Sequence, residues 1–449
     1  MTEQKGKMVL SMFMITAGYH YDSWTMPGSR AEELGYADLI IDMAKKAEAA
    51  KLDSLFFGDI YEAGKIPGAD PTVSGHYEPI TSLSVVSQHT SRIGLIGTAS
   101  TTFCAPYNVA RQFAGLDTLS NGRAGWNIVT SVTGNENFGI ESMPPSIERY
   151  RRASEFVDVV TALWDSWADD AVVADRERGI WADPERIRPI AHRGEFYSVH
   201  GPINMRRPPQ GRPILVQAGS SDAGIELGSR VADCIYTAQP ERQEAIDFYA
   251  DYKKRVAAKG RDPAHVKILP GLVPVVGRTR GEAKDLLDLL GSHVRMDAGR
   301  YILGRRLKMD LTELDLDRQI PAEWFLSPEE ETNSRYLIFR DLSINKGLTL
   351  RELIIEHSRG HGHLWLGGTT SEVADTMVDW FEAGACDGFS LNAAFVPGGV
   401  DLICDLLVPE LQSRGYFREE YQGTTLREHL GLPRPPAWDR QAADEANGG

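Results

Sequence analysis

The sequence alternates short apolar runs, often rich in β-branched residues, with longer segments whose apolar side chains recur at helical spacing. The run at residues 8–15, for example, precedes a segment at 37–52 in which Leu39, Ile40 and Met43 fall on one face of a helix. Continuous apolar runs are typical of strands buried on both faces, as in a parallel sheet. Eight such runs are predicted as strands, at residues 8–15, 54–57, 93–100, 124–130, 214–218, 234–237, 266–276 and 388–392.

Eight strand and helix units in one chain favour a closed α/β barrel, the TIM (β/α)8 fold, although an open doubly wound sheet would give a similar local pattern. Two stretches interrupt the alternation, residues 169–212 after the fourth strand and about 292–348 after the seventh. Long excursions of this kind are usually lids or binding loops. We therefore expect one domain over residues 1–420 with two insertions, followed by a C-terminal arm or tail at 421–449.

The charge balance limits the partners of such a chain. It has 63 acidic and 48 basic residues and a formal net charge of −15 at pH 7, so nucleic acid is not an expected partner. No apolar stretch is long enough to span a membrane, and no secretory leader precedes the first apolar run. The cysteines are far apart and form no CxxC pair, which indicates reduced thiols in a cytoplasmic protein. They are Cys104, Cys234, Cys386 and Cys404.

Polar residues follow four of the predicted strands, and in an α/β barrel the chemistry lies at the carboxyl ends of the strands. A single serine or aspartate in such a position is more often the N-cap of the next helix than a functional group. Together, however, these side chains predict a pocket rich in hydroxyl and amide groups at one mouth of the barrel. They are Asp59, Ser100, Thr101, Thr102, Asn127, Thr130, Ser131, Gln217, Ser220 and Ser221.

The segment 217–224, Gln-Ala-Gly-Ser-Ser-Asp-Ala-Gly, suits a phosphate group, because glycine lets a ligand approach the backbone and the serines precede the amino end of a helix. The alternative is a nucleophile elbow of the GxSxG type with Ser221 as the nucleophile of a serine hydrolase, but Ala223 replaces the final glycine. The spacing from Gly58 to Lys65 does not match a P-loop, and no GxGxxG motif follows a strand.

Histidines that suit chemistry occur in two places. His357, His361 and His363 have a spacing that metal ligands can have, but His-Gly-His without a set of carboxylates is more typical of a glycine-rich loop, so no metal is expected. His20 follows the first predicted strand among aromatic residues. It is either a loop histidine with satisfied hydrogen bonds or an acid–base group at the mouth of the barrel.

Longer motifs are spread over most of the chain. The most specific is Asn-Gly-Arg-Ala-Gly-Trp-Asn-Ile-Val-Thr-Ser at residues 121–131. The others lie at residues 17–21, 56–59, 137–139, 148–150, 217–221, 386–389 and 414–418. In these motifs the chain resembles the bacterial-luciferase-like flavin monooxygenases, and within them the family of nitrilotriacetate monooxygenase component A and dibenzothiophene-sulfone monooxygenase.

The resemblance implies a TIM barrel that binds FMN without a covalent bond at the carboxyl ends of its strands. Ser146 stands where members of the family often have a histidine, four residues before Tyr150, so the grip on the phosphate is expected to be weaker or built differently. Asn127 is expected to line the face of the flavin that reacts with O2. The flavin contacts that the resemblance implies are Asp59, Thr102, Asn127, Tyr150, Ser220 and Ser221.

The resemblance also implies the oxygenase half of a two-component monooxygenase. Because the chain has no dinucleotide-binding motif, reduced FMN would come from a separate NAD(P)H-dependent flavin reductase and react here with O2. Thr102 and Asn127 are the expected hydrogen-bonding groups of the oxygen reaction, and His20 is expected to move a proton. A non-catalytic flavin-binding barrel is the second alternative beside the serine hydrolase, and a homodimer or homotetramer is the expected assembly.

The substrate is implied only as a class of small organic molecule that is oxygenated next to nitrogen or sulfur, with cleavage of a C–N or C–S bond. Arginines in the two insertions would bind an anionic substrate, because a guanidinium group matches the geometry of a carboxylate or sulfonate. For any single one of them, a solvated loop charge is the more ordinary interpretation. These residues are Arg206, Arg207, Arg305 and Arg306.

Overall fold

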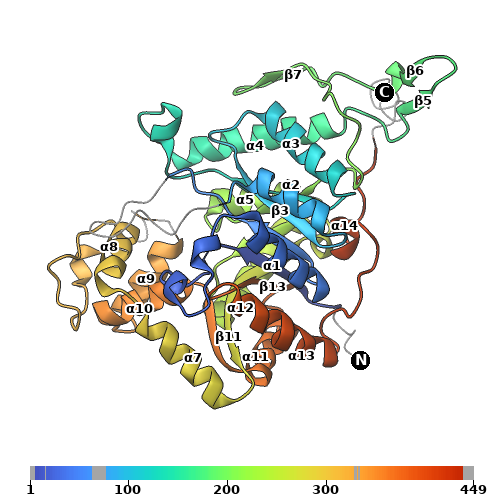
Figure 1. The fold of residues 1–449 in the computed structure, drawn as a ribbon. Coiled ribbons are helices and arrows are strands. Elements are labelled where there is room, and N and C mark those ends of the chain that lie inside the picture. The colour runs from blue at the N-terminus through green and yellow to red at the C-terminus, as the bar shows by residue number, and fades with distance from the viewer. Residues whose placement is uncertain (1–5, 16, 63–76, 328–330, 332–333, 438–449) are drawn as a thin grey trace.

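The centre of the molecule is a parallel sheet in which every strand but one belongs to a closed ring (Figure 1). The structure is a computed structural model, and it describes residues 6–15, 17–62, 77–327, 331 and 334–437. The strands of the ring are β1 (Val9–Met14), β2 (Ser54–Phe57), β3 (Gly94–Ser100), β4 (Ala124–Val129), β9 (Ile214–Gln217), β10 (Cys234–Thr237), β11 (Lys267–Gly277) and β13 (Gly388–Asn392).

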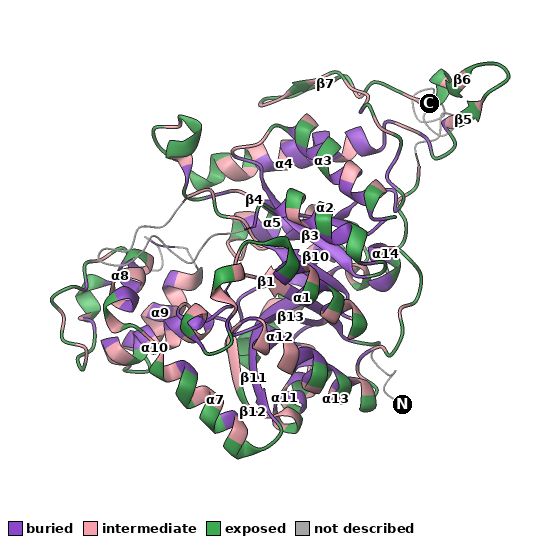
Figure 2. Ribbon diagram, in the orientation of Figure 1, coloured by how far each residue is buried: buried purple, intermediate pink, exposed green. Residues whose placement is uncertain are grey.

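The ring closes into the eight-stranded barrel that the sequence predicts. Strand β10 pairs with β11, with Cys234 opposite Lys267, and β13 pairs with β1, with Gly388 opposite Val9. Each predicted strand is confirmed to within one residue at either end. Figure 2 shows that the strands are buried, as continuous apolar runs require.

Helices cover the outer face of the barrel. In α1, the apolar residues recur at helical spacing and are buried against the sheet, whereas the polar face is exposed. Among the residues that the structure describes, no helix has both the length and the apolar content needed to cross a membrane. The covering helices are α1 (Ala37–Ala49), α2 (Pro79–His89), α3 (Pro106–Leu119), α4 (Ser146–Trp164), α5 (Asp222–Val231), α6 (Arg242–Ala258), α7 (Arg280–Ser292), α11 (Thr370–Glu382), α12 (Gly398–Leu402) and α13 (Val408–Ser413).

A ninth strand, β12 (Leu364–Thr369), pairs with the outer half of the long strand β11. This strand was missed in the sequence because Gly367 and Gly368 interrupt its apolar pattern, and glycine is rare in strands. The interpretation of the stretch around His361 and His363 as a loop holds only for the turn itself, since a helix ends at Gly360 immediately before it.

The two insertions have different structures. The first contains two hairpins, β5 (Val172–Asp175) with β6 (Ile180–Ala182) and β7 (His192–Arg193) with β8 (Ser198–Val199). The second is largely helical, and its residues Leu303 and Phe339 share a small apolar core with Leu353 of the helix that follows it. Figure 1 shows its helices grouped beside the barrel, on the side away from α14. The insertion contributes α8 (Met296–Leu307) and α9 (Ser334–Ile344), and α10 (Leu350–Gly360) follows it in the same group.

The segment expected as a C-terminal arm packs against the base of the barrel, at the amino ends of the strands. Its short helix α14 (Leu426–His429) and the residues after it bury three leucines in the cluster that fills the barrel. The side chain of Arg427 donates to Asp233, directly before β10, at 3.2 Å. The three leucines are Leu426, Leu430 and Leu432.

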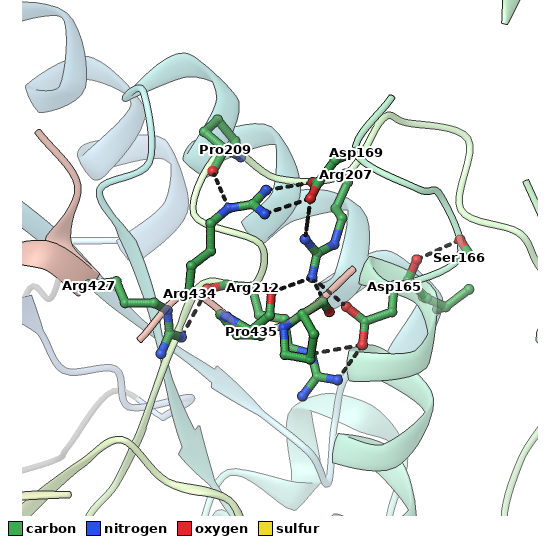
Figure 3. Close-up of polar contacts among 11 residues, drawn as sticks. Asp165, Ser166, Asp169, Arg207, Pro209, Arg212, Arg427, Arg434 and Pro435 are labelled. Carbon is green, nitrogen blue, oxygen red and sulfur yellow. Dashed lines mark hydrogen bonds and ion pairs between the residues drawn. The ribbon is translucent and has the colours of Figure 1, made fainter. Parts of the chain in front are cut away.

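A group of ion pairs joins this segment to the first insertion (Figure 3). Arg434 donates two hydrogen bonds of 2.6 Å to the carboxylate of Asp169. Arg207 is buried between Asp169 and Asp165, with nitrogen–oxygen distances of 3.0 and 3.3 Å, and also donates to the carbonyl oxygen of Pro435. The positive charge of Arg207 is therefore neutralised by aspartates of the same chain.

Candidate functional site

At the carboxyl ends of β3 and β4, Asn127 is held in one orientation by its neighbours. Its Nδ2 donates to Oγ1 of Thr98 at 2.9 Å, and the Thr98 hydroxyl donates to the carbonyl oxygen of Phe57 at 2.8 Å. The Asn127 amide oxygen is buried and has no hydrogen-bond partner among the described residues. A buried polar atom without a partner is rare in proteins and indicates a place where a ligand or water binds.

Thr102 lies beside this chain of hydrogen bonds, in the turn after β3. Its main-chain N–H donates to Oγ of Ser100 at 3.1 Å, and that oxygen is 2.7 Å from Oγ of Ser131 in the loop after β4. The Thr102 hydroxyl is itself buried and has no partner in the described part of the chain. The structure thus brings together the polar ends of two strands that the sequence predicted separately.

Asp59 follows β2 and is half-buried. Burial raises the pKa of its carboxyl group to about 6, and contact with the Tyr61 hydroxyl lowers this pKa only in part. The Tyr61 oxygen also accepts a hydrogen bond of 3.4 Å from the main-chain N–H of Ser100. Tyr61 therefore links Asp59 to the end of β3, a role that sequence analysis did not predict.

Tyr150 and the turn after β9 form the opposite end of the candidate site. A Cβ atom placed on Gly219 would lie 2.7 Å from the Tyr150 hydroxyl oxygen, so this hydroxyl is directly against the backbone of the turn. Ser221 is the N-cap of α5, and Ser220 precedes it, half-buried. The amino end of a helix favours an anion, so the turn, the hydroxyl groups and Tyr150 suit a phosphate.

Ser146 is exposed at the first position of α4, one helical turn before Tyr150. No contact among the described residues joins it to the Tyr150 hydroxyl or to the serine turn. The Ser146 side chain therefore faces solvent.

Ser221 has an ordinary extended backbone, with φ −72° and ψ 159°, and its Oγ accepts a hydrogen bond from the main-chain N–H of Gly224. A nucleophile elbow instead places its serine on a strained turn, with the hydroxyl directed out of the sheet. The geometry of Ser221 is that of a helix cap and argues against the serine hydrolase.

His20 is completely buried in the loop after β1. Its main-chain N–H donates to the carbonyl oxygen of Ala394, just beyond the end of β13, at 2.9 Å. Neither ring nitrogen has a hydrogen-bond partner among the described residues. Burial lowers the pKa of the imidazole to about 4, so the ring is neutral at pH 7.

A second wall of the mouth consists of aromatic rings and histidines that sequence analysis did not assign to the site. Phe13 of β1 stacks on Tyr236 of β10, and the Tyr236 hydroxyl lies 2.6 Å from Nε2 of His363. His361 lies edge-on to Tyr19, and its Nε2 is 2.7 Å from the Tyr19 carbonyl oxygen. Tyr236 lies near the carboxyl end of a predicted strand. The rule that places functional side chains at the carboxyl ends of barrel strands, which identified Asn127, would therefore also have identified Tyr236.

The same histidines were considered as metal ligands from their spacing. Within the described ranges, no three side chains of histidine, cysteine, aspartate or glutamate are arranged to hold a metal ion. His363 instead contacts the guanidinium group of Arg335 through Nε2. A guanidinium group only donates hydrogen bonds, so this nitrogen carries no proton.

A closed α/β barrel with hydroxyl, amide and imidazole groups at the carboxyl ends of its strands is typical of an enzyme. The comparison with known families identifies the class as flavin-dependent monooxygenases, which are oxidoreductases. The chain belongs to the luciferase-like monooxygenase family, whose model matches residues 12–385.

Curated relatives are similar over nearly the whole chain. N-acetyl-S-(2-succino)cysteine monooxygenase of Bacillus subtilis is 40% identical over 97% of this chain and 99% of its own length. Nitrilotriacetate monooxygenase component A of Aminobacter aminovorans is 38% identical, over 96% and 97% of the two chains. Among solved structures, EDTA monooxygenase from Chelativorans sp. BNC1 superposes with a TM-score of 0.81 at 31% identity and covers 96% of this chain and 99% of that one.

Proposed function

We propose that the chain is the oxygenase component of a two-component monooxygenase that uses reduced FMN and O2. One oxygen atom enters a small organic substrate next to nitrogen or sulfur, where a C–N or C–S bond then breaks, and the other oxygen atom leaves as water. The two electrons come from reduced FMN, made by a separate NAD(P)H-dependent reductase. The nitrilotriacetate relative is named a component A, which supports the division between two proteins.

The observation that carries this proposal is the set of unpartnered polar atoms at one mouth of the barrel. The Thr102 hydroxyl, the Asn127 amide oxygen and both ring nitrogens of His20 are buried without partners among the described residues. A flat ring system with polar edges would supply hydrogen-bond partners for these buried atoms. Polar atoms in surface loops, in contrast, bind water and need no such ligand. The residues of the mouth therefore fit FMN.

Each proposed contact has a distinct task. Tyr150, Ser220 and Ser221 hold the phosphate at the amino end of α5, and Asp59 and the strand ends contact the ring system. When bound, reduced FMN supplies the electrons that activate O2. The protein binds and orients it, and the aromatic wall keeps bulk water out.

Asn127 and His20 act on the oxygen reaction itself in this proposal. Because Thr98 fixes the Asn127 amide, its free oxygen points in a defined direction and accepts a hydrogen bond from the bound flavin. His20 is the proposed proton-transfer group, and because burial lowers its pKa to about 4, its ring holds a proton only transiently.

The test is to mix the protein with photoreduced FMN without oxygen, admit O2, and follow both flavin absorbance and hydrogen peroxide. We expect oxidation to differ in rate from that of free reduced flavin, and Asn127→Ala to keep flavin binding while raising the peroxide yield. Oxidation at the rate of free flavin would exclude an oxygenase. Tight flavin binding without oxygenated product from any amine or thioether would instead favour the non-catalytic barrel.

A further inference from the structure

Asn127 lies on the inner face of the barrel, near the carboxyl end of β4. It is paired in register with Thr98 of β3 on one side and with Val216 of β9 on the other, and Val216 belongs to the apolar cluster that fills the barrel. The next inward-facing residues below this pair, Ile96 and Gly125, have no polar side chain. The apolar layer below leaves the mouth as the side from which a ligand can reach the buried amide.

The orientation of this amide follows from the single proton of the Thr98 hydroxyl. The hydroxyl donates that proton to the carbonyl oxygen of Phe57 at 2.8 Å, because a carbonyl oxygen can only accept. The hydroxyl oxygen is then left as an acceptor for Nδ2 of Asn127, which lies 2.9 Å away. If the amide were turned over, its oxygen would compete with Phe57 for one proton, and a buried acceptor would lose its partner. Thr98 therefore holds the unpartnered Asn127 oxygen toward the mouth.

An amide oxygen accepts hydrogen bonds and cannot donate one, so it distinguishes between the two redox states of a flavin. The ring nitrogen N5, beside the carbon atom that reacts with O2, carries a hydrogen atom in the reduced ring and only a lone pair in the oxidised ring. The N–H group at N3 is present in both states and makes no such difference. An acceptor fixed against N5 therefore stabilises bound reduced flavin and is repelled by the oxidised form.

We propose that Thr98 sets the preference of this site for reduced over oxidised FMN, although its hydroxyl contacts Phe57 and Asn127 rather than the flavin. Thr98 is thus a positioning residue, and Asn127 is the group that accepts a hydrogen bond from N5. The inference rests on the proposed function, in which Asn127 lines the part of the ring that reacts with O2. A site of this kind takes up reduced FMN from the reductase and releases oxidised FMN.

The experiment measures the dissociation constants of oxidised FMN in air and of photoreduced FMN without oxygen, both from the quenching of tryptophan fluorescence of the full chain. Thr98→Val removes the hydroxyl at nearly constant volume, and Thr98→Ser keeps it. Thr118→Val is the matched control, because the Thr118 hydroxyl also donates to a carbonyl oxygen at 2.8 Å, but within helix α3. Oxidised 5-deaza-FMN, which has a C–H group in place of N5, is a probe that requires no substitution.

We expect the unsubstituted chain to bind reduced FMN about tenfold or more tightly than oxidised FMN, which raises the midpoint potential of the bound two-electron couple by about 30 mV or more. Thr98→Val should bring the two affinities to within about threefold, because the freed amide can turn its NH2 group toward N5 of the oxidised ring. Thr98→Ser and Thr118→Val should keep the preference. Oxidised 5-deaza-FMN should bind the unsubstituted chain about threefold or more tightly than oxidised FMN, since it lacks the repelling lone pair.

Equal affinities of the unsubstituted chain for the two redox states would overturn the inference, and this outcome does not depend on any variant folding. A Thr98→Val variant that keeps the preference, a Thr98→Ser variant that loses it, or an equal loss of affinity for both states would also overturn it, the last because Thr98 would then have only a structural role. These measurements involve no reaction with O2. Reduced flavin can still oxidise at a rate set by the protein when they fail, so failure of this inference is distinct from failure of the oxygenase.

Discussion

Gly219 illustrates how a single residue shapes the proposed phosphate-binding end of the site. A Cβ atom there would lie 2.5 Å from Nε2 of Gln217 and 2.7 Å from the Tyr150 hydroxyl oxygen, closer than such atoms approach in proteins. The absence of a side chain lets Tyr150 reach the turn, so the requirement for glycine comes from a close approach between two elements.

We expect Gly219→Ala to raise the Kd for FMN by about tenfold, because the added methyl group displaces Tyr150 from the turn. Quenching of flavin fluorescence measures this affinity. Gly291→Ala is the matched control, since a Cβ atom at Gly291 meets nothing within 4 Å. Equal affinities of the two variants would separate Gly219 from the flavin site.

His20 makes the folded state sensitive to acid. Its pKa is about 4 in the folded protein and about 6.5 in an unfolded chain, so between these values the unfolded chain binds the extra proton. Stability therefore falls as the pH drops from about 6.5 to 4, at a rate of about 1.4 kcal/mol per pH unit for this one group.

We expect His20→Gln to show a shallower loss of the free energy of unfolding over that pH range, as measured by urea denaturation at several pH values. His89→Gln is the control because His89 is exposed at the end of α2. If both variants lose stability with the same slope as the unsubstituted chain, His20 is not protonated on unfolding.

At the scale of elements, the first insertion and the C-terminal segment hold each other in place. The two hydrogen bonds from Arg434 and the contact with Arg207 lower the pKa of Asp169 to about 2. A lowered carboxyl pKa stabilises the folded state above the unfolded value of about 3.9, and this stabilisation is lost as the pH falls towards 2.

Asp169→Asn should lower the free energy of unfolding at pH 7 by about 1 kcal/mol or less, because the Asp169 side chain is 42% exposed and solvent screens the pairs. The difference from the unsubstituted chain should shrink between pH 4 and pH 2, which chemical denaturation at each pH would reveal. Asp170→Asn, at an exposed neighbour that pairs with Arg186, controls for the loss of charge. A difference that grows on acidification would contradict the assignment.

The elements also show where sequence patterns fail. Strand β12 has the pairing of a regular strand, but its two glycines remove the apolar signal that identified the other strands. The second insertion is predicted as a lid or binding loop, and its apolar pattern did not indicate the helices that bury apolar residues against one another. Sequence patterns reflect the preference of each residue for helix, strand or turn. They predict structure least well where pairing with a distant segment of the chain decides the conformation.

At the scale of the whole molecule, the barrel has the proposed site at one mouth, and its base is closed by the C-terminal segment. Leu426 comes from the C-terminal segment but is buried in the cluster that contains Val9 and Ile96 of the barrel strands. Its side chain occupies the space beside Gly94, where a Cβ atom would lie 2.4 Å from it. The stretch from Leu426 to Leu432 is thus part of the folded core.

Leu426→Ala should destabilise the whole barrel by about 2–4 kcal/mol, because truncation of a buried leucine leaves a cavity. Thermal and urea unfolding of the full chain would measure the loss. Leu119→Ala is the control, since Leu119 is 56% exposed. A variant as stable as this control would mean that the C-terminal segment is not coupled to the barrel.

The sequence by itself determined the barrel and much of one side of its mouth. Local apolar runs indicate strands that are buried on both faces. Parallel strands bring their carboxyl ends together, so Asp59, Thr102 and Asn127 were predicted from their positions after or near those ends. Only the tertiary structure decided that Arg207 is bound by aspartates and that the C-terminal segment closes the base. Those outcomes depend on contacts between segments far apart in the chain, and no local pattern encodes them.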